Sequence, residues 1–251
     1  MLDVAACFLA TAQVCSIRRA LERVAGGPLT DLDLIRLTAL AFLHDVGKAN
    51  AGFQSKRWIA TEQAAPPGWP ATAGHAQEAL RIFGEARLLG ELPAQEMDSW
   101  GSACWSLWRA SISHHGRPVV ESSSAAVEIW RPVTQAGQVV YDPQATLREI
   151  GQCTKQWFAE AFQDGPPLPQ SPEFSHLFAG LVQFADWLGS DTRFSLTPNP
   201  VKTATSGSGS VPAMQFKKWV LTPPHGEKLY LNSRIFLRSL VWKNRDPFKP
   251  R

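Results

Sequence analysis

The sequence predicts an all-α protein, a helical bundle with a short, basic C-terminal tail that has the character of a β-hairpin. Apolar residues recur at three- and four-residue intervals in six segments, as expected of helices that bury one face in a core. These segments are 2–25, 31–46, 74–89, 97–114, 145–163 and 173–190. Before residue 195 few segments alternate apolar and polar residues with period two, so no sheet-based core is expected.

Turn-forming residues mark the ends of the predicted helices. Glycine lets the chain leave a helix and proline cannot continue one, so groups rich in both are typical of helix boundaries. Such groups are Gly26-Gly27-Pro28 (just ahead of the cap residue Asp31), Pro66-Pro67-Gly68, Gly116-Arg117-Pro118 and Gly165-Pro166-Pro167. Between 118 and 144, the pairs Val119-Val120 and Val139-Val140 indicate a loop or a small hairpin.

The composition changes near residue 195. Residues 1–194 hold 15 Lys and Arg against 20 Asp and Glu, a net charge of −5, whereas residues 195–251 hold 10 against 2, a net charge of +8. We therefore expect one domain over 1–195, a flexible Pro- and Ser-rich linker over 196–212 and a basic tail over 213–251. Apolar runs around Pro223-Pro224-His225-Gly226 predict a strand pair in the tail. The Ser-Gly repeat at 206–210 leaves open whether the tail is native or an appended segment.

Several classes of protein are disfavoured. The four cysteines contain no C-x-x-C pair, which argues against a thiolate metal site or a disulfide framework and favours a reducing, cytoplasmic location. No apolar run reaches the roughly 20 residues of a membrane span, and the N-terminal segment lacks the charge order of a secretory signal, so no membrane association is expected. No G-x-x-x-x-G-K-S/T phosphate loop occurs, so no nucleotide cofactor is expected.

Histidines and aspartates gather at predicted helix ends in four places. These are His44-Asp45 in AFLHDVGKANAGFQ, His75 at the predicted start of the third helix, His114-His115 at the end of the fourth, and Asp186 in LVQFADWLGSD. Neutral imidazoles with a few carboxylates bind transition-metal ions, and one carboxylate can bridge two ions about 3.5–4 Å apart. Such ions neutralise phosphate oxygens and supply a hydroxide at neutral pH.

Each of these residues also has a purely structural interpretation. His75 alone is consistent with a helix cap, Asp45 with an ion pair to Lys48, and His114-His115 with stabilisation of a helix C-terminus through its dipole. The combination of all four places in one helical domain favours the metal site.

The motifs HDVGK, the following ANAGFQ, then GH, SHHG and ADWLGSD resemble the HD nuclease domain of the CRISPR-associated type I interference nuclease-helicase, across 1–194. The resemblance implies two metal sites in an HD helical bundle. In the first, the ligands would be His44, Asp45 and Asp186. In the second, Asp45 would be joined by His75, His114 and His115. It further implies that Lys48 lies beside the reacting phosphate, and Ser190, one turn after Asp186, is expected to orient that carboxylate.

The resemblance also implies an activity, cofactors and partners. The expected reaction is hydrolysis of single-stranded DNA, after a guide-RNA surveillance complex has opened its target, with a helicase domain or subunit in trans. The expected cofactors are two divalent ions of manganese, nickel, cobalt or iron. The family commonly has a further histidine just before a segment like 2–6; Met1 stands there instead, so one of the two ions is expected to be weakly bound.

Cations and aromatic residues beside the motifs are candidate DNA contacts, because single strands are bound by backbone cations and by stacking of bases. We expect Lys56, Arg57, Trp58 and Arg117 to serve in this way, with a simple solvated surface as the alternative. Two other functions remain open: an HD phosphohydrolase acting on a nucleotide, and a catalytically silent HD module that docks on a partner protein. The count of only two Tyr argues mildly against a closed nucleotide pocket.

Overall fold

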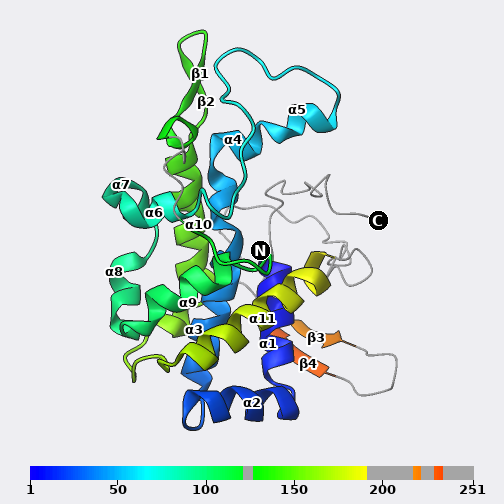
Figure 1. The fold of residues 1–251 in the computed structure, drawn as a ribbon, viewed down its shortest axis with the longest axis vertical. Helices are drawn as coiled ribbons and strands as arrows, with labels where there is room; N and C mark the ends of the chain where they lie inside the picture. The colour runs from blue at the N-terminus through cyan, green and yellow to red at the C-terminus, as the bar shows by residue number, and fades with distance from the viewer. Residues whose placement is uncertain (121–126, 191–216, 222–228, 234–251) are drawn as a thin grey trace, which may run out of the picture.

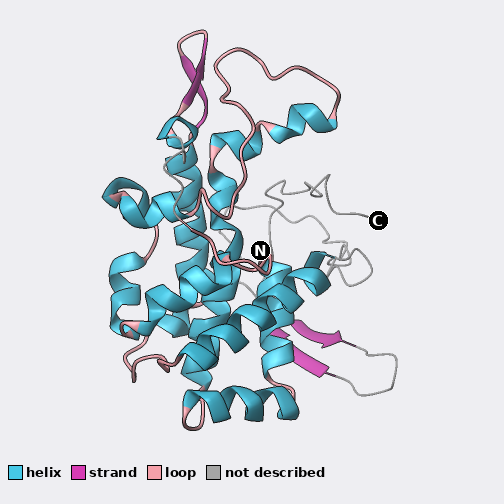
Figure 2. Cartoon of the chain, viewed as in Figure 1, coloured by secondary structure: helices cyan, strands magenta, loops and turns pink. Residues whose placement is uncertain are grey.

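The computed structural model of the chain describes residues 1–120, 127–190, 217–221 and 229–233, and these are mostly helical, which confirms the predicted all-α class (Figure 1, Figure 2). The α-helices are α1 (Leu2–Ala12), α2 (Cys15–Ala25), α3 (Asp31–Phe42), α4 (Ala51–Gln54), α5 (Lys56–Ala60), α6 (Leu80–Gly84), α7 (Ala86–Leu89), α8 (Ala94–Met97), α9 (Ala103–Ile112), α10 (Pro143–Trp157) and α11 (Pro172–Ser190). Short 3-10 helices lie at η1 (Leu43–Ala49), η2 (Asp98–Trp100), η3 (Val127–Trp130) and η4 (Ala159–Phe162).

The first predicted helix, over 2–25, is in fact two. The chain leaves helical geometry at Val14, which is extended, and α1 and α2 meet at 86°. The reason is burial: α1 is buried on most of its surface, whereas Leu21 is the buried residue of α2. A straight continuation would carry the polar α2 away from the bundle, so the chain turns and runs across one end of it, at the bottom of Figure 1.

Two other predicted helices are shorter than expected. The segment 74–89 does not begin as a helix at His75; turns occupy 76–79, α6 begins at Leu80, and α7 follows. The segment 97–114 is interrupted at Gly101, whose φ of +89° is a conformation that other residues rarely adopt. Periodicity detects the buried face of each segment but not these local breaks.

The core is built where α1 packs against α11 and α3, with α9 on the other side of α11. Phe8 of α1 and Phe178 of α11 meet edge to face, with ring centroids 5.4 Å apart. The 3-10 helix η1 continues directly from α3 and contacts α9. The end of α3, the end of α9 and the middle of the bundle are thus brought together by core packing.

A buried arginine ties α3 to the chain that leads into α11. Arg36 has 0% exposure and donates hydrogen bonds to the carbonyl oxygens of Ala161 (3.0 Å), Gln163 (2.8 Å) and Pro166 (2.7 Å). A buried cation of this kind is tolerated only when its donors are satisfied. Arg36 therefore fixes the path of the 161–166 segment across the core.

Two small hairpins complete the described chain. β1 (Val133–Gln135) pairs antiparallel with β2 (Gln138–Tyr141), within the segment where a loop or hairpin was predicted. β3 (Lys217–Leu221) pairs antiparallel with β4 (Leu229–Ser233), which confirms the predicted strand pair of the tail. The predicted linker 196–212 and the turn Pro223–Gly226 lie outside the described residues.

In the described part of the chain, no helix by itself has the length and apolar character needed to cross a membrane. The sharply bent pair α1 and α2 meets the length and composition criteria when the two are taken together.

Replacing Arg36 with Met should lower the free energy of unfolding by about 3 kcal/mol, because three main-chain carbonyls lose their donor inside the core. Urea denaturation followed by circular dichroism measures this. Arg19→Gln, which removes an exposed cation from α2, should leave the midpoint unchanged. Equal midpoints for the two variants would contradict the role given to Arg36.

Candidate metal centre

The turn at the end of α3 places His44 and Asp45 inside the molecule. α3 begins with a capping box in which the side chains of Thr30 and Asp33 each bond the other's main-chain N–H. It passes into η1, where Asp45, with φ −103° and ψ 15°, departs from helical geometry. His44 is 0% and Asp45 5% exposed, so both side chains face the core rather than solvent.

Asp45 lies between two groups of histidines. Its Oδ2 is 3.1 Å from His44 Nε2, and its Oδ1 is 3.1 Å from His75 Nε2 and 3.6 Å from His114 Nε2. The two carboxylate oxygens thus face different imidazoles. This is the arrangement expected of a carboxylate shared by two cation sites.

The histidines and carboxylates form two overlapping groups in which the potential ligand atoms lie within 4.8 Å of one another. One group contains His44, Asp45 and His114, and the other contains His75, His114 and His115. The two rings His75 and His115 bring their Nε2 atoms to 3.0 Å. His114 belongs to both groups, whereas the resemblance placed it with the second ion alone.

Asp186 of α11 reaches the centre beside His44. Its Oδ1 lies 3.7 Å from His44 Nε2 and accepts a hydrogen bond of 3.0 Å from Ser190 Oγ, one turn later on the same helix. The structure therefore gives Ser190 the orienting geometry expected of it. Six predicted ligands, drawn from η1, the 71–79 segment, the end of α9 and α11, converge in one region.

Main-chain carbonyls orient two of the imidazoles. His44 Nδ1 lies 2.7 Å from Ala41 O, and His114 Nδ1 lies 3.0 Å from Ser111 O, so in each ring Nδ1–H donates, and Nε2 carries the lone pair when the ring is neutral. In both rings Nε2 is the atom that faces Asp45. Such a second hydrogen bond is typical of histidines that bind metal ions.

The residues fit a divalent cation, because two buried polar atoms of the centre have no hydrogen bond. Among the described residues, His44 Nε2 and Asp45 Oδ1 are enclosed and lack a partner of suitable geometry. Leaving a buried polar atom unsatisfied costs about 1–3 kcal/mol. Ions accepting lone pairs from these atoms would remove that cost, and the donor set of imidazoles and carboxylates is one that transition metals prefer.

The protonation states of Asp45, His114 and His115 also favour metal binding. Burial opposes ionisation of Asp45, but the positive charges of His44 and Lys48 outweigh it and hold the pKa of Asp45 well below its usual value. Burial, reinforced by His44, lowers the pKa of His114 to about 3, and burial reinforced by His75 lowers the pKa of His115. Near pH 7, Asp45 is thus an anion while His114 and His115 are neutral, the forms that coordinate metal ions.

The pKa of His44 shifts in the opposite direction from those of His114 and His115. Burial works against its charged form, but the neighbouring carboxylates of Asp45 and Asp186 outweigh this and raise its pKa. In the absence of a cation, a protonated His44 would supply the positive charge that the two carboxylates require. A metal ion binding there would take over that charge and release the proton.

Lys48 contacts the centre directly. Its Nζ lies 2.6 Å from Asp45 Oδ2, the ion pair that the structural interpretation of the motif predicted. Its main chain is held by Gln54, whose Nε2 donates to Lys48 O at 2.8 Å. Gln54 is the last residue of the ANAGFQ motif, so that part of the motif positions the lysine.

Asn50 was not predicted as a site residue, although it belongs to the same motif. It is fully buried, and its Nδ2 donates to Gly47 O (2.7 Å) and to Gly74 O (2.9 Å). Because Gly74 directly precedes His75, Asn50 joins the His44-Asp45 turn to the segment that carries His75. Gly47 permits this approach, since a Cβ at that position would lie 1.9 Å from His75 O.

The N-terminal residue also borders the centre. Burial lowers the pKa of the Met1 α-amino group, and the charges of Asp45, Lys48 and Asp186 are close enough to act on it.

The predicted DNA contacts lie near this centre but do not join it. Lys56 Nζ lies 4.7 Å from the centroid of the Phe53 ring, and the Arg57 guanidinium lies 3.9 Å from the Trp58 ring. Arg117 is exposed, two residues beyond His115 in the turn that follows α9. None of them contacts Asp45 in the interactions described above.

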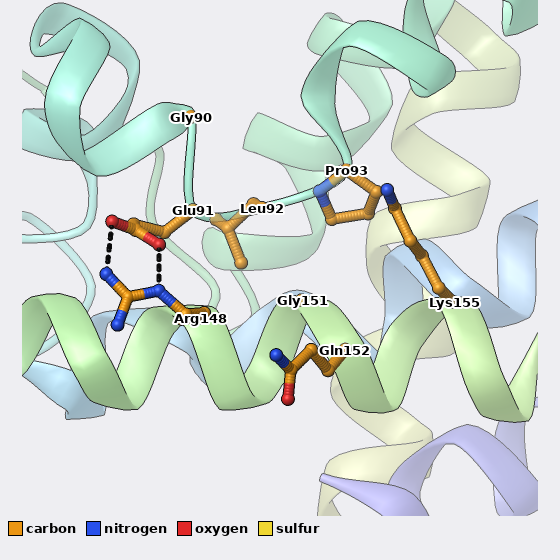
Figure 3. A pocket seen from close by; sticks show the side chains of 8 residues that line it. All are labelled: Gly90, Glu91, Leu92, Pro93, Arg148, Gly151, Gln152 and Lys155. Atoms are coloured by element: carbon orange, nitrogen blue, oxygen red, sulfur yellow. Dashed lines mark hydrogen bonds and ion pairs between the residues drawn. The ribbon is translucent and has the colours of Figure 1, made fainter.

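A pocket elsewhere on the molecule has a structural explanation. It lies between the 90–93 turn and α10, where Arg148 makes a two-pronged ion pair with Glu91 at 2.7 and 2.9 Å (Figure 3). Lys155, also at its edge, pairs with Glu96. Because these charges are already paired and none of the predicted ligands lines the pocket, it gives no sign of a second site.

Comparison with known proteins supports the interpretation of the motifs. A family model described as Cas3, HD domain, matches residues 1–195. No curated protein and no solved structure matches the chain.

Asn50→Ala should weaken metal binding by the group that contains His75 by about 10- to 100-fold, because second hydrogen bonds around a metal site hold its ligands in place. Calorimetric titration of the full chain with Mn²⁺ measures this. Ser190→Ala is the matched control. It removes the hydrogen bond to Asp186 and should weaken metal binding by the group that contains His44. An Asn50→Ala protein that is folded and binds both ions within twofold of wild type would contradict the positioning role.

Proposed function

Because the chain belongs to the Cas3 HD domain family, whose members are CRISPR-associated, metal-dependent nucleases, we propose that it hydrolyses phosphodiester bonds of single-stranded DNA in CRISPR interference. The observation that carries the proposal is the position of Asp45, whose two oxygens face separate groups of histidines. A carboxylate placed in this way supports two adjacent divalent ions and so a phosphoester substrate.

The residues that would hold the ions follow from the geometry and from the family motif. His44, Asp45 and Asp186 would hold one ion, and Asp45, His75, His114 and His115 would hold the other. Manganese, nickel, cobalt or iron suits this nitrogen-rich donor set. When bound, such ions neutralise phosphate oxygens and lower the pKa of water, which supplies a nucleophile at neutral pH.

The protein's own side chains would hold the charges and the ligand atoms in the positions that this chemistry requires. Asp45 stays ionised, and the main-chain bonds to His44 and His114 hold their Nε2 atoms toward it. Lys48, whose ammonium group lies beside Asp45, would stabilise negative charge on a phosphate oxygen as the ester is cleaved. His115 is exposed, which supports a site that a polymer reaches from solvent.

The partners proposed are those of the family: a guide-RNA surveillance complex that exposes the strand, and a helicase domain or subunit that delivers it, in the cytoplasm. The sequence contains no phosphate-loop motif, so in this proposal ATP-driven movement of DNA is the task of the helicase. The chain's own part would be to cleave the strand presented to it.

Metal-stripped protein supplied with manganese or nickel should cleave circular single-stranded DNA into linear and then shorter products, seen on a denaturing gel. Asp45→Asn should lower the rate by about 10³-fold, because loss of a shared anionic ligand removes several kcal/mol of charge stabilisation. Glu62→Gln, an exposed acid outside the centre, should cleave like wild type. Chelation with EDTA should abolish cleavage.

Other outcomes would favour the competing functions. Rapid hydrolysis of nucleoside triphosphates, with DNA left intact, would favour a nucleotide phosphohydrolase. Failure to bind any of the metals or to cleave either substrate would favour a silent interaction module.

A further inference from the structure

The segment after the metal centre is unusually basic for the part of the chain in which it lies. Residues 46–61 contain Lys48, Lys56 and Arg57 and no Asp or Glu, although the first 194 residues carry a net charge of −5. Arg18, Arg81 and Arg148, elsewhere on the described surface, pair with glutamates close to them. Within 46–61 the sequence offers no carboxylate, and Lys48 pairs with Asp45 of the metal centre.

Aromatic rings hold the arginine of this segment. The Arg57 guanidinium lies 3.9 Å from the Trp58 ring centroid and 4.5 Å from that of Trp69, and the two indoles are 4.5 Å apart. No carboxylate of the described residues pairs with Arg57. A guanidinium stacked on aromatic faces keeps its N–H donors in the plane of the group and is well suited to phosphate.

A chain of contacts fixes this arginine relative to the metal centre. Trp69 stacks on Tyr141, with ring centroids 5.6 Å apart and planes 28° from parallel. The hydroxyl of Tyr141 donates a hydrogen bond of 2.6 Å to Ala49 O, the last residue of η1. Arg57 is thus tied through two aromatic residues to the turn that carries His44 and Asp45.

Between Arg57 and the metal centre, lysine ammonium groups also lie over an aromatic ring, that of Phe53. Phe53 packs edge to face on His75, with centroids 5.2 Å apart, and the ammonium groups of Lys48 and Lys56 lie 5.6 and 4.7 Å from its centroid. Lys48 of η1 and Lys56 and Arg57 of α5 therefore each lie over an aromatic ring.

We propose that these residues form a strand-guiding subsite, in which Lys56 and Arg57 bind successive phosphates of a single DNA strand and so deliver the next phosphodiester to Lys48 and the metal centre. The aromatic rings orient the cations, with Trp69 holding the Arg57 guanidinium, and Trp58, which is partly exposed, offers an aromatic surface to an unpaired base. This inference rests on the proposed nuclease function and assigns its DNA path.

The first test is binding of a fluorescein-labelled 20-nucleotide thymidine strand, followed by anisotropy, to the full chain carrying Asp45→Asn, without added metal, so that cleavage is suppressed. Arg57→Gln should weaken binding about 5- to 10-fold and reduce the slope of log Kd against log salt by about 0.7, the value for one lost phosphate contact on a single strand. Arg19→Gln, which removes an exposed cation at the opposite end of the molecule on α2, should change neither (Figure 1).

A double-mutant cycle tests the aromatic support. Trp69→Leu should weaken binding about threefold when Arg57 is present and have no effect in the Arg57→Gln background, since its contribution is to hold that guanidinium. An equal loss in both backgrounds would overturn the positioning role of Trp69. Equal affinities for Arg57→Gln and Arg19→Gln would overturn the subsite, and so would an equally strong, Arg57-dependent affinity for a poly-glutamate peptide.

Cleavage by the corresponding proteins with Asp45 intact separates this inference from the proposed function. Cleavage of DNA with no change in KM for Arg57→Gln would overturn the subsite and leave the nuclease standing. Arg57-dependent binding without cleavage in any metal would overturn the nuclease and leave a single-strand-binding surface.

Discussion

A carboxylate as deeply buried as that of Asp45 is stable as an anion only when positive charge or hydrogen bonds surround it. Here the surroundings are three imidazoles and one ammonium group, gathered from segments far apart in the sequence. Neutral imidazoles cannot balance two carboxylates by themselves. The raised pKa of His44 reflects this demand for positive charge, and the low pKa of Asp45 reflects the positive charges of His44 and Lys48 beside it; bound metal ions would supply that charge in place of the proton on His44.

The rest of the fold keeps that arrangement in place. α3 carries the His44-Asp45 turn and is anchored on its other side by Arg36, whose guanidinium holds three carbonyls of the chain leading into α11. α11 in turn supplies Asp186. Asn50 ties the turn to the His75 segment, and Tyr141 ties it to the aromatic residues around Arg57. One buried charge is therefore supported by contacts that run through most of the bundle.

The sequence predicted the class of fold, and its motifs identified the six side chains that the structure brings together, because helical periodicity and short motifs are local properties. It did not predict the break at Val14 or the late start of the helix after His75, since these depend on which faces the finished bundle buries. The motif containing Asn50 was recognised, but its hydrogen bond to Gly74 spans 24 residues and is visible only in three dimensions. The stacking of Trp69 on Tyr141 is long-range in the same sense.

The position of Asp45 predicts that its carboxylate is shared by two metal ions. Anomalous diffraction from crystals of the full chain soaked in manganese would locate both ions. We expect two peaks about 3.5–4 Å apart, with the Asp45 carboxylate between them. Crystals that bind manganese only elsewhere, with the Lys48–Asp45 ion pair intact, would contradict it.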